Sequence, residues 1–426
     1  MGRLGSANGR NGRNGRNGRN GRNGRNGRNG RDGANLSGVS SDGQVASALI
    51  STFEGITHSW DSSKRRPDQR CGHGGDLHSV TQPSNVLAGF EGYEDFFQDH
   101  IVDYNIDALF APLTLNEGEH VILGAASAEH AIFTIQRPSP TGAASDVGAL
   151  NTRLARQMKW VKSAAAARDE RLDEILVQQT DTLSFFAALV GLDESRTPWT
   201  IALLEAVLRF GTYIEMPMKL HFNAARPCQM SSIVQPVIQP PTHGGFPSGH
   251  ALEAYAVATL LYGLVENSGF EGNGGQSQFN ALKAFDASDR GSGGDRCESG
   301  QHAQEQLLLM RLAARIAENR TVAGVHFPAD SFVGAGMGLA IGEYLVNVLS
   351  GKAKSAAYSM SFQRDCERPS LFCADFRHDT LAVHAPAESP IARVNGAINL
   401  GQAHGSPILR EIWARARVEM STPSFE

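Results

Sequence analysis

Residues 219–227 read Lys-Leu-His-Phe-Asn-Ala-Ala-Arg-Pro and follow a long helical pattern that begins near residue 197. Lys219 and Arg226 are seven residues apart, so on one helix they would share nearly the same face, about 10 Å apart along the axis. Pro227 disfavours a helical conformation at Arg226, which predicts that the helix has ended there. Two long cationic side chains can thus converge on one anion near a helix end.

A second segment, Phe-Pro-Ser-Gly-His at residues 246–250, stands directly before a helical pattern at 251–265. The first turn of a helix presents unpaired N–H groups and the positive end of the helix dipole, which together favour an anion. Gly249 allows the backbone to approach an oxyanion closely. Ser248 adds a hydroxyl donor, and His250 adds a side chain that can exchange a proton near neutral pH.

The third segment, residues 319–330, reads Asn-Arg-Thr-Val-Ala-Gly-Val-His-Phe-Pro-Ala-Asp. Arg320 closes one predicted helix (302–320), Gly324 marks a break, and Pro328 suits the first turn of the next helix. His326 then lies at a helix N-terminus, with Asp330 four residues later on the same side. A carboxylate there can accept a hydrogen bond from one imidazole nitrogen and leave the other as a nucleophile or ligand.

Together the three segments supply three fixed positive charges, backbone donors, one hydroxyl and two histidines. This equipment suits a trigonal oxyanion with an axial ligand. The chemistry is either phosphoryl transfer through a phospho-histidine or permanent binding of vanadate, which mimics that transition state.

The order Lys-x6-Arg-Pro, Pro-Ser-Gly-His, Arg-x5-His-x3-Asp resembles the superfamily of type 2 phosphatidic acid phosphatases, bacterial class A acid phosphatases and vanadium haloperoxidases. Asn319 departs from the serine usual beside the arginine, and the segment between His250 and Asn319 is longer than in small acid phosphatases. The motifs lie in the second half of a long chain, and Ala251 follows the Pro-Ser-Gly-His motif, as in haloperoxidases. The sequence therefore favours a vanadium-dependent haloperoxidase, with a phosphomonoesterase as the alternative.

The resemblance implies one vanadate per chain, with His326 as the ligand to vanadium and Asp330 orienting its ring. The implied oxyanion-binding residues are Lys219, Arg226, Ser248, Gly249, His250 and Arg320. His250 would take a proton from hydrogen peroxide, and Lys219 would polarise the bound oxygen that the halide attacks. Hypohalous acid would then halogenate small organic acceptors.

His243 lies seven residues before His250 and resembles the second active-site histidine of algal bromoperoxidases, where fungal chloroperoxidases have phenylalanine. We therefore include it among the predicted catalytic residues and expect bromide or iodide as the halide. A surface loop histidine is the alternative. A non-catalytic oxyanion-binding or tail-mediated interaction protein is a third hypothesis, which loss of either His250 or His326 would have favoured.

The expected fold is all-α, built from helical bundles in two packed halves. Helical patterns cover residues 148–178, 182–190, 198–222, 251–265, 302–320, 328–349 and 405–420. Thr197 and Pro198 are expected as the N-cap and first residue of their helix. A flexible insertion is expected at 269–300, and residues 36–426 are interpreted as one catalytic domain.

Charge and composition limit the other functions. The net charge is −5, but residues 1–32 contain nine arginines and one acid, so the remaining chain is strongly acidic and argues against nucleic-acid binding. The Asn-Gly-Arg repeat within residues 1–35 predicts a disordered tail. No signal peptide is evident. No membrane span is evident either, since the apolar run at 331–350 contains Glu343. A soluble, cytoplasmic protein is expected, and by analogy with bundle haloperoxidases a homodimer.

Five cysteines without a Cys-x-x-Cys pair do not suggest a disulfide framework. Free thiols are expected, with a local pair between Cys366 and Cys373 left open.

Overall fold

The structure is a computed structural model, and it describes residues 90–91, 93, 95–115, 120–126, 131–136, 143–268, 278–285, 298–361, 375–376, 381, 391–400 and 406–421. The predicted tail, the Cys366 and Cys373 pair and much of the predicted insertion lie outside these residues.

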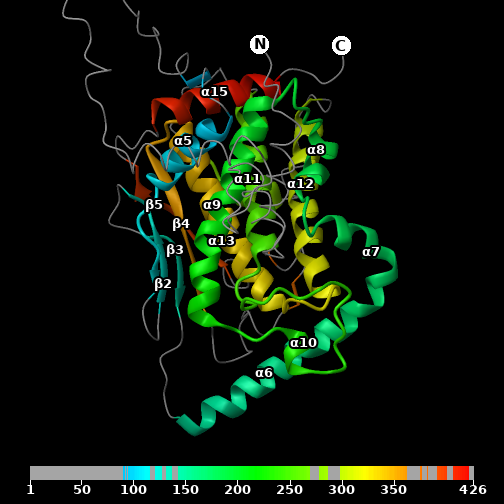
Figure 1. Ribbon diagram of the computed structural model, residues 1–426. Coiled ribbons are helices and arrows are strands. Elements are labelled where there is room, and N and C mark those ends of the chain that lie inside the picture. The colour runs from blue at the N-terminus through cyan, green and yellow to red at the C-terminus, as the bar shows by residue number, and fades with distance from the viewer. Residues whose placement is uncertain are drawn as a thin grey trace, which may run out of the picture.

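The described chain is mostly helical, which confirms the predicted helical fold (Figure 1). Its main helices are α5 (Asp95–Asp107), α6 (Ala143–Ala164), α7 (Arg168–Val177), α8 (Leu183–Val190), α9 (Pro198–Phe222), α11 (Gly249–Ser268), α12 (Glu298–Val322), α13 (Pro328–Leu349) and α15 (Pro407–Ser421). Shorter turns are η2 (Ala165–Ala167), α10 (Pro227–Met230) and η3 (Ala281–Phe285). The division of the chain into two bundle halves, and its description as one domain, stay predictions.

Helix α13 is the centre of the core, and all of its residues are buried. It packs against α11 through Gly334, Gly338 and Gly342, one helical turn apart. A Cβ built on Gly338 would lie 2.3 Å from the carbonyl oxygen of Leu252, and one on Gly342 would lie 2.6 Å from Cβ of Thr259. The missing side chains therefore let the two backbones approach closely.

We expect Gly338→Ala to lower the free energy of unfolding by about 1–3 kcal/mol, because the added methyl group meets backbone atoms that cannot move aside cheaply. Gly336→Ala on the same helix is the matched control. Its Cβ would meet the flexible end of Met360 at 2.8 Å, so its cost should be smaller. Denaturant unfolding of both variants measures the difference, and equal losses would contradict the close-packing account.

A five-stranded sheet lies along one side of the bundle, which the sequence analysis did not predict (Figure 1). Its order is β1 (Thr114–Leu115), β2 (His120–Gly124), β3 (Ala131–Gln136), β4 (Lys354–Ser361) and β5 (Ile391–Asn399). Neighbours are antiparallel except β3 and β4, which pair in parallel with Phe133 opposite Tyr358. Phe133, Ile135, Tyr358 and Met360 are buried, so the sheet closes one face of the core.

Buried ion pairing joins α13 to this sheet. Glu343 accepts hydrogen bonds from Arg393 of β5 and, at 2.6 Å, from the hydroxyl of Tyr358. By length and composition α13 is the one described helix that could cross a membrane, and the whole of that apolar stretch is buried inside the fold.

One predicted helix is divided in the structure, and one predicted helix start, Thr197 followed by Pro198, is confirmed. The pattern at 148–178 is divided at η2 into α6 and α7. Thr197 occupies the N-cap of α9, but its side chain makes no capping bond. Glu419 of α15 performs that function, accepting hydrogen bonds from the N–H groups of Trp199 at 3.0 Å and Thr200 at 2.8 Å. A carboxylate there also interacts favourably with the helix dipole.

Candidate active site

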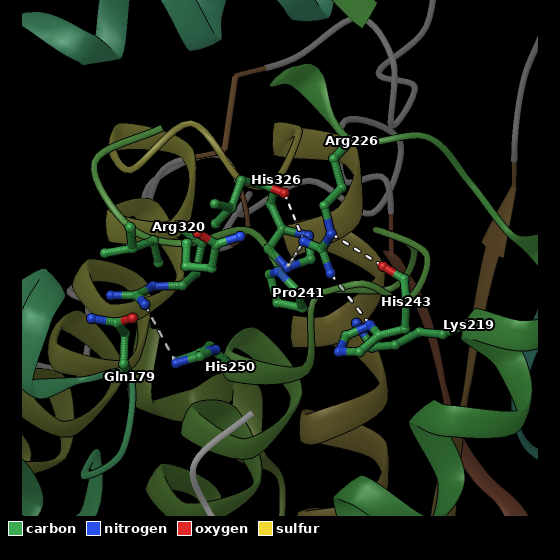
Figure 2. A pocket seen from close by; sticks show the side chains of 11 residues that line it. Gln179, Lys219, Arg226, Pro241, His243, His250, Arg320 and His326 are labelled. Carbon is green, nitrogen blue, oxygen red and sulfur yellow. Dashed lines mark hydrogen bonds between the residues drawn. The ribbon is translucent and has the colours of Figure 1, made fainter. Parts of the chain in front are cut away.

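Six of the nine predicted site residues line one pocket, where the ends of α7 and α9, the loop before α11 and the α12–α13 junction converge; the other three, Ser248, Gly249 and Asp330, are not among the residues that line it. Its described lining consists of Gln179, Lys219, Arg226, Ile238, Gln239, Pro241, His243, His250, Arg320, Val325 and His326. Figure 2 shows Arg320 beside His250 and Gln179 at one side, and Arg226, His326, His243 and Lys219 at the other. Segments far apart in sequence thus supply one cationic wall.

Arg226 is placed differently from the prediction. Helix α9 ends at Phe222, where Asn223 adopts a left-handed conformation, and Arg226 is extended at the N-cap of α10. It therefore does not share a helix face with Lys219. The early end lets the buried guanidinium turn into the pocket, where Nη1 donates to the carbonyl of Val325 at 2.8 Å and Nη2 donates to that of Gly244 at 3.2 Å.

Lys219 lies in the last turn of α9 and is 1% exposed. Its Nζ donates to the carbonyl oxygen of Pro247 at 2.7 Å and is 3.8 Å from Oε2 of Glu215, one turn earlier. Glu215 is also buried, and it was not among the predicted site residues. An i,i+4 pair was visible in the sequence, but nothing there indicated that both groups are buried.

The Pro-Ser-Gly-His segment leads into α11, which begins at Gly249. The N–H of Ser248 donates to the carbonyl of Asp330 at 3.0 Å, and a Cβ on Gly334 would lie 2.2 Å from the carbonyl oxygen of Ser248. Helix α13 therefore holds this segment in place. The hydroxyl of Ser248 is fully buried and has no hydrogen-bond partner, which calls for a bound group or water at that position.

The ring of His326 is held between Asp330 and Arg226. Its Nδ1 lies 3.1 Å from Oδ2 of Asp330, and its Nε2 lies 3.2 Å from Nη1 of Arg226. The same carboxylate oxygen accepts the N–H of Phe327 at 2.9 Å. Burial raises the pKa of Asp330 to about 7, although that N–H and the charges of Arg226 and Lys219 oppose the rise. This geometry directs Nε2 towards the pocket, as a ligand or nucleophile requires.

Arg320 and His250 both contact the end of α7. Nη2 of Arg320 donates to Oε1 of Gln178 at 3.0 Å and to the carbonyl of Ile175 at 3.3 Å. Nε2 of His250 is 2.7 Å from the carbonyl oxygen of Gln178. Gln178 is buried, and it was not among the predicted site residues because no local pattern shows a contact between residues so far apart.

His243 lines the pocket, where its Nδ1 lies 3.3 Å from Nη2 of Arg226 and 3.1 Å from the carbonyl oxygen of Gly244. Burial, followed by the charge of Lys219, lowers its pKa from 6.5 to about 4, while the carbonyl of Gly244 opposes the shift. At neutral pH the ring is therefore neutral.

This low pKa of His243 predicts an acid-dependent loss of stability. The unfolded chain takes up a proton near pH 6.5 and the folded chain only near pH 4, so the free energy of unfolding should fall as the pH drops through this range. His243→Asn should remove this part of the pH dependence, which corresponds to the uptake of at most one proton on unfolding. Denaturant unfolding at a series of pH values compares the two slopes, and parallel curves would contradict the low pKa.

Charge distinguishes this pocket from an ordinary polar cleft. Lys219, Arg226 and Arg320 are each 1% exposed, and no Asp or Glu is among the described residues that line it. Within the described parts of the chain, no three His, Cys, Asp or Glu residues are grouped as a metal cation requires. Such a wall favours a multiply charged anion.

Other residues near the motifs lie outside the pocket. The side chain of Asn319 contacts Glu174 at 3.0 Å and Gln178 at 3.0 Å, which is a supporting position. His221 is exposed on α9, and Cys228 is a partly buried free thiol.

Comparison with known proteins assigns part of the chain to a family. No curated protein matches the chain. Residues 199–353 match the family model described as the PAP2 superfamily, whose members are generally phosphatases or haloperoxidases. All of the predicted site residues fall in this range, whereas Gln178 precedes it. Residues 199–353 of this chain are therefore a PAP2 superfamily domain.

Proposed function

We propose that this protein is a vanadate-dependent haloperoxidase that oxidises bromide or iodide with hydrogen peroxide to hypohalous acid. One observation carries the proposal: three buried cations line the same pocket as His326, with no carboxylate among its described lining. Nδ1 of His326 contacts Asp330, and its Nε2 lies 3.2 Å from Nη1 of Arg226. A multiply charged oxyanion that also takes a nitrogen ligand from His326 would satisfy both features.

The available donors fit such a group. Arg226 and Arg320 offer planar guanidinium groups, and Lys219 offers an ammonium group. The buried hydroxyl of Ser248 and the first N–H groups of α11, beginning with Gly249, add neutral donors. His326 would be the ligand to vanadium. When bound, vanadium(V) acts as a Lewis acid for peroxide and keeps its oxidation state.

The residues of the chain would then divide the remaining tasks. Asp330 keeps the ring of His326 in one orientation. His250 would exchange a proton with hydrogen peroxide, and the ammonium group of Lys219 would polarise a peroxide oxygen. His243, neutral at pH 7 and beside Lys219 and Arg226, would adjust the hydrogen bonding around that oxygen.

A phosphomonoesterase is the alternative, because the same contacts suit a phosphoryl group. His326 would be the nucleophile through Nε2, and His250 would protonate the leaving group. Two features support the haloperoxidase: His243 lines the pocket, and Ala251 directly follows the Pro-Ser-Gly-His motif.

The remaining partners follow from this chemistry. Small organic acceptors would react with released hypohalous acid, so the pocket need not recognise them. We also propose a soluble, cytoplasmic protein without bound nucleic acid, which by analogy forms a homodimer. The complete burial of α13 is compatible with a protein that has no membrane span.

Titration of metal-stripped protein with orthovanadate tests the proposed site. We expect one vanadate per chain, competition by inorganic phosphate, and weaker binding by Arg226→Ala. Protein loaded in this way should oxidise bromide and iodide faster than chloride. Absence of vanadate binding by the folded chain would contradict the proposal, as would loaded protein that oxidises none of the three halides.

A further inference from the structure

We infer that Gln178, at the end of α7 and outside the PAP2 domain, is a positioning residue for both Arg320 and His250. The inference concerns the working of the oxyanion site and rests on the proposed function. It extends the site to a helix that the family match does not include.

Two different groups of Gln178 make the contacts. Its side-chain oxygen accepts from Nη2 of Arg320 at 3.0 Å, and its backbone oxygen lies 2.7 Å from Nε2 of His250. The carbonyl of Ile175, one turn earlier, accepts from the same Nη2 at 3.3 Å. One end of α7 therefore holds a cation and a titratable ring that line the pocket from α12 and α11.

The carbonyl contact determines which nitrogen of His250 carries a proton. Nε2 of His250 has two neighbours: the carbonyl oxygen of Gln178 at 2.7 Å, which can only accept, and Nη1 of Arg320 at 3.4 Å, which can only donate. The contact with the carbonyl is much the shorter, so it places a hydrogen on Nε2. The neutral ring is then held as the Nε2–H tautomer.

A neutral amide has a particular consequence for Arg320. It fixes the guanidinium without adding negative charge, so the full positive charge is left for an oxyanion. A carboxylate at position 178 would hold Arg320 equally well but would cancel much of that charge at the pocket wall.

A network behind Gln178 keeps it in place. Nδ2 of Asn319 donates to Oε1 of Gln178 and to Oε2 of Glu174, each at 3.0 Å. Glu174 in turn binds Arg315 of α12 at 2.7 Å. Two donors on one oxygen also fix which way the amide of Gln178 faces. Gln178 is 1% exposed, so water cannot easily replace these contacts.

The test compares full-length wild type with Gln178→Ala, Gln178→Glu and the control Leu172→Ala, a partly exposed residue of the same helix. Calorimetry with inorganic phosphate reports the oxyanion site. Nitrogen-15 spectra of labelled histidine report the tautomer of His250 without any ligand. Thermal unfolding identifies variants that no longer fold.

We expect Gln178→Ala to weaken phosphate binding by about 10–100-fold, the usual effect of removing a group that orients a ligand. The spectra should change from a single Nε2–H tautomer to a mixture, because the end of α7 loses its anchor. Gln178→Glu should fold well and keep the tautomer, yet still bind phosphate at least about 10-fold more weakly, by loss of charge. A merely structural role would instead be restored fully by Glu.

The inference would be overturned if folded Gln178→Ala bound phosphate with the affinity of wild type and kept the same His250 tautomer. If wild type fails to bind phosphate, the proposed function fails, and the His250 spectra alone decide the role of Gln178.

Discussion

His326→Ala is expected to remove nearly all vanadate-dependent activity, because it deletes the ring whose Nε2 faces the pocket. Loss of a group that merely orients a ligand typically costs about 10–100-fold in affinity, so loss of the ligand itself should exceed about 100-fold. Calorimetric titration with orthovanadate, followed by a bromination assay, measures both effects.

His221→Ala is the matched control for this prediction. His221 is exposed on α9 and does not line the pocket. The control variant should bind vanadate and turn over as wild type does. If His326→Ala retained vanadate with wild-type affinity, the assignment of His326 as the ligand would be wrong.

His250→Ala should separate binding from turnover. The vanadate affinity should change little, because Arg226, Arg320 and Lys219 still supply the positive charge. Turnover should fall by about 10²–10⁴-fold, the usual contribution of a positioned group that transfers a proton. Steady-state rates on vanadate-loaded protein give the result. Normal bromination by His250→Ala would remove this residue from the mechanism.

Much of the helical fold could be predicted because its boundaries are local. Gly191 ends α8 in a left-handed conformation, and Pro198 begins α9. The sheet was missed because β3 pairs with β4, more than 200 residues later, and no local pattern specifies such a pairing. In β4, the apolar residues Ala356, Tyr358 and Met360 occupy every second position and are buried. This alternation is the sequence signal that could have indicated a strand.

The site was predictable to the extent that its motifs are contiguous. Asp330 lies four residues after His326, so their contact follows from helix geometry. The prediction that Arg226 shares a helix face with Lys219 was wrong, because α9 already ends at Phe222, with Asn223 as its C-cap, and not at Pro227. Gln178 could not be found in this way, since its contacts with Arg320 and His250 join helices whose packing no local pattern specifies.

The most direct test of the proposed function is peroxide-dependent bromination of a chlorinated dione by metal-stripped protein, with and without added orthovanadate. We predict bromination that appears only when vanadate is added. No bromination in either sample, together with hydrolysis of an aryl phosphate that vanadate inhibits, would contradict the haloperoxidase and recast His326 as the nucleophile of a phosphatase.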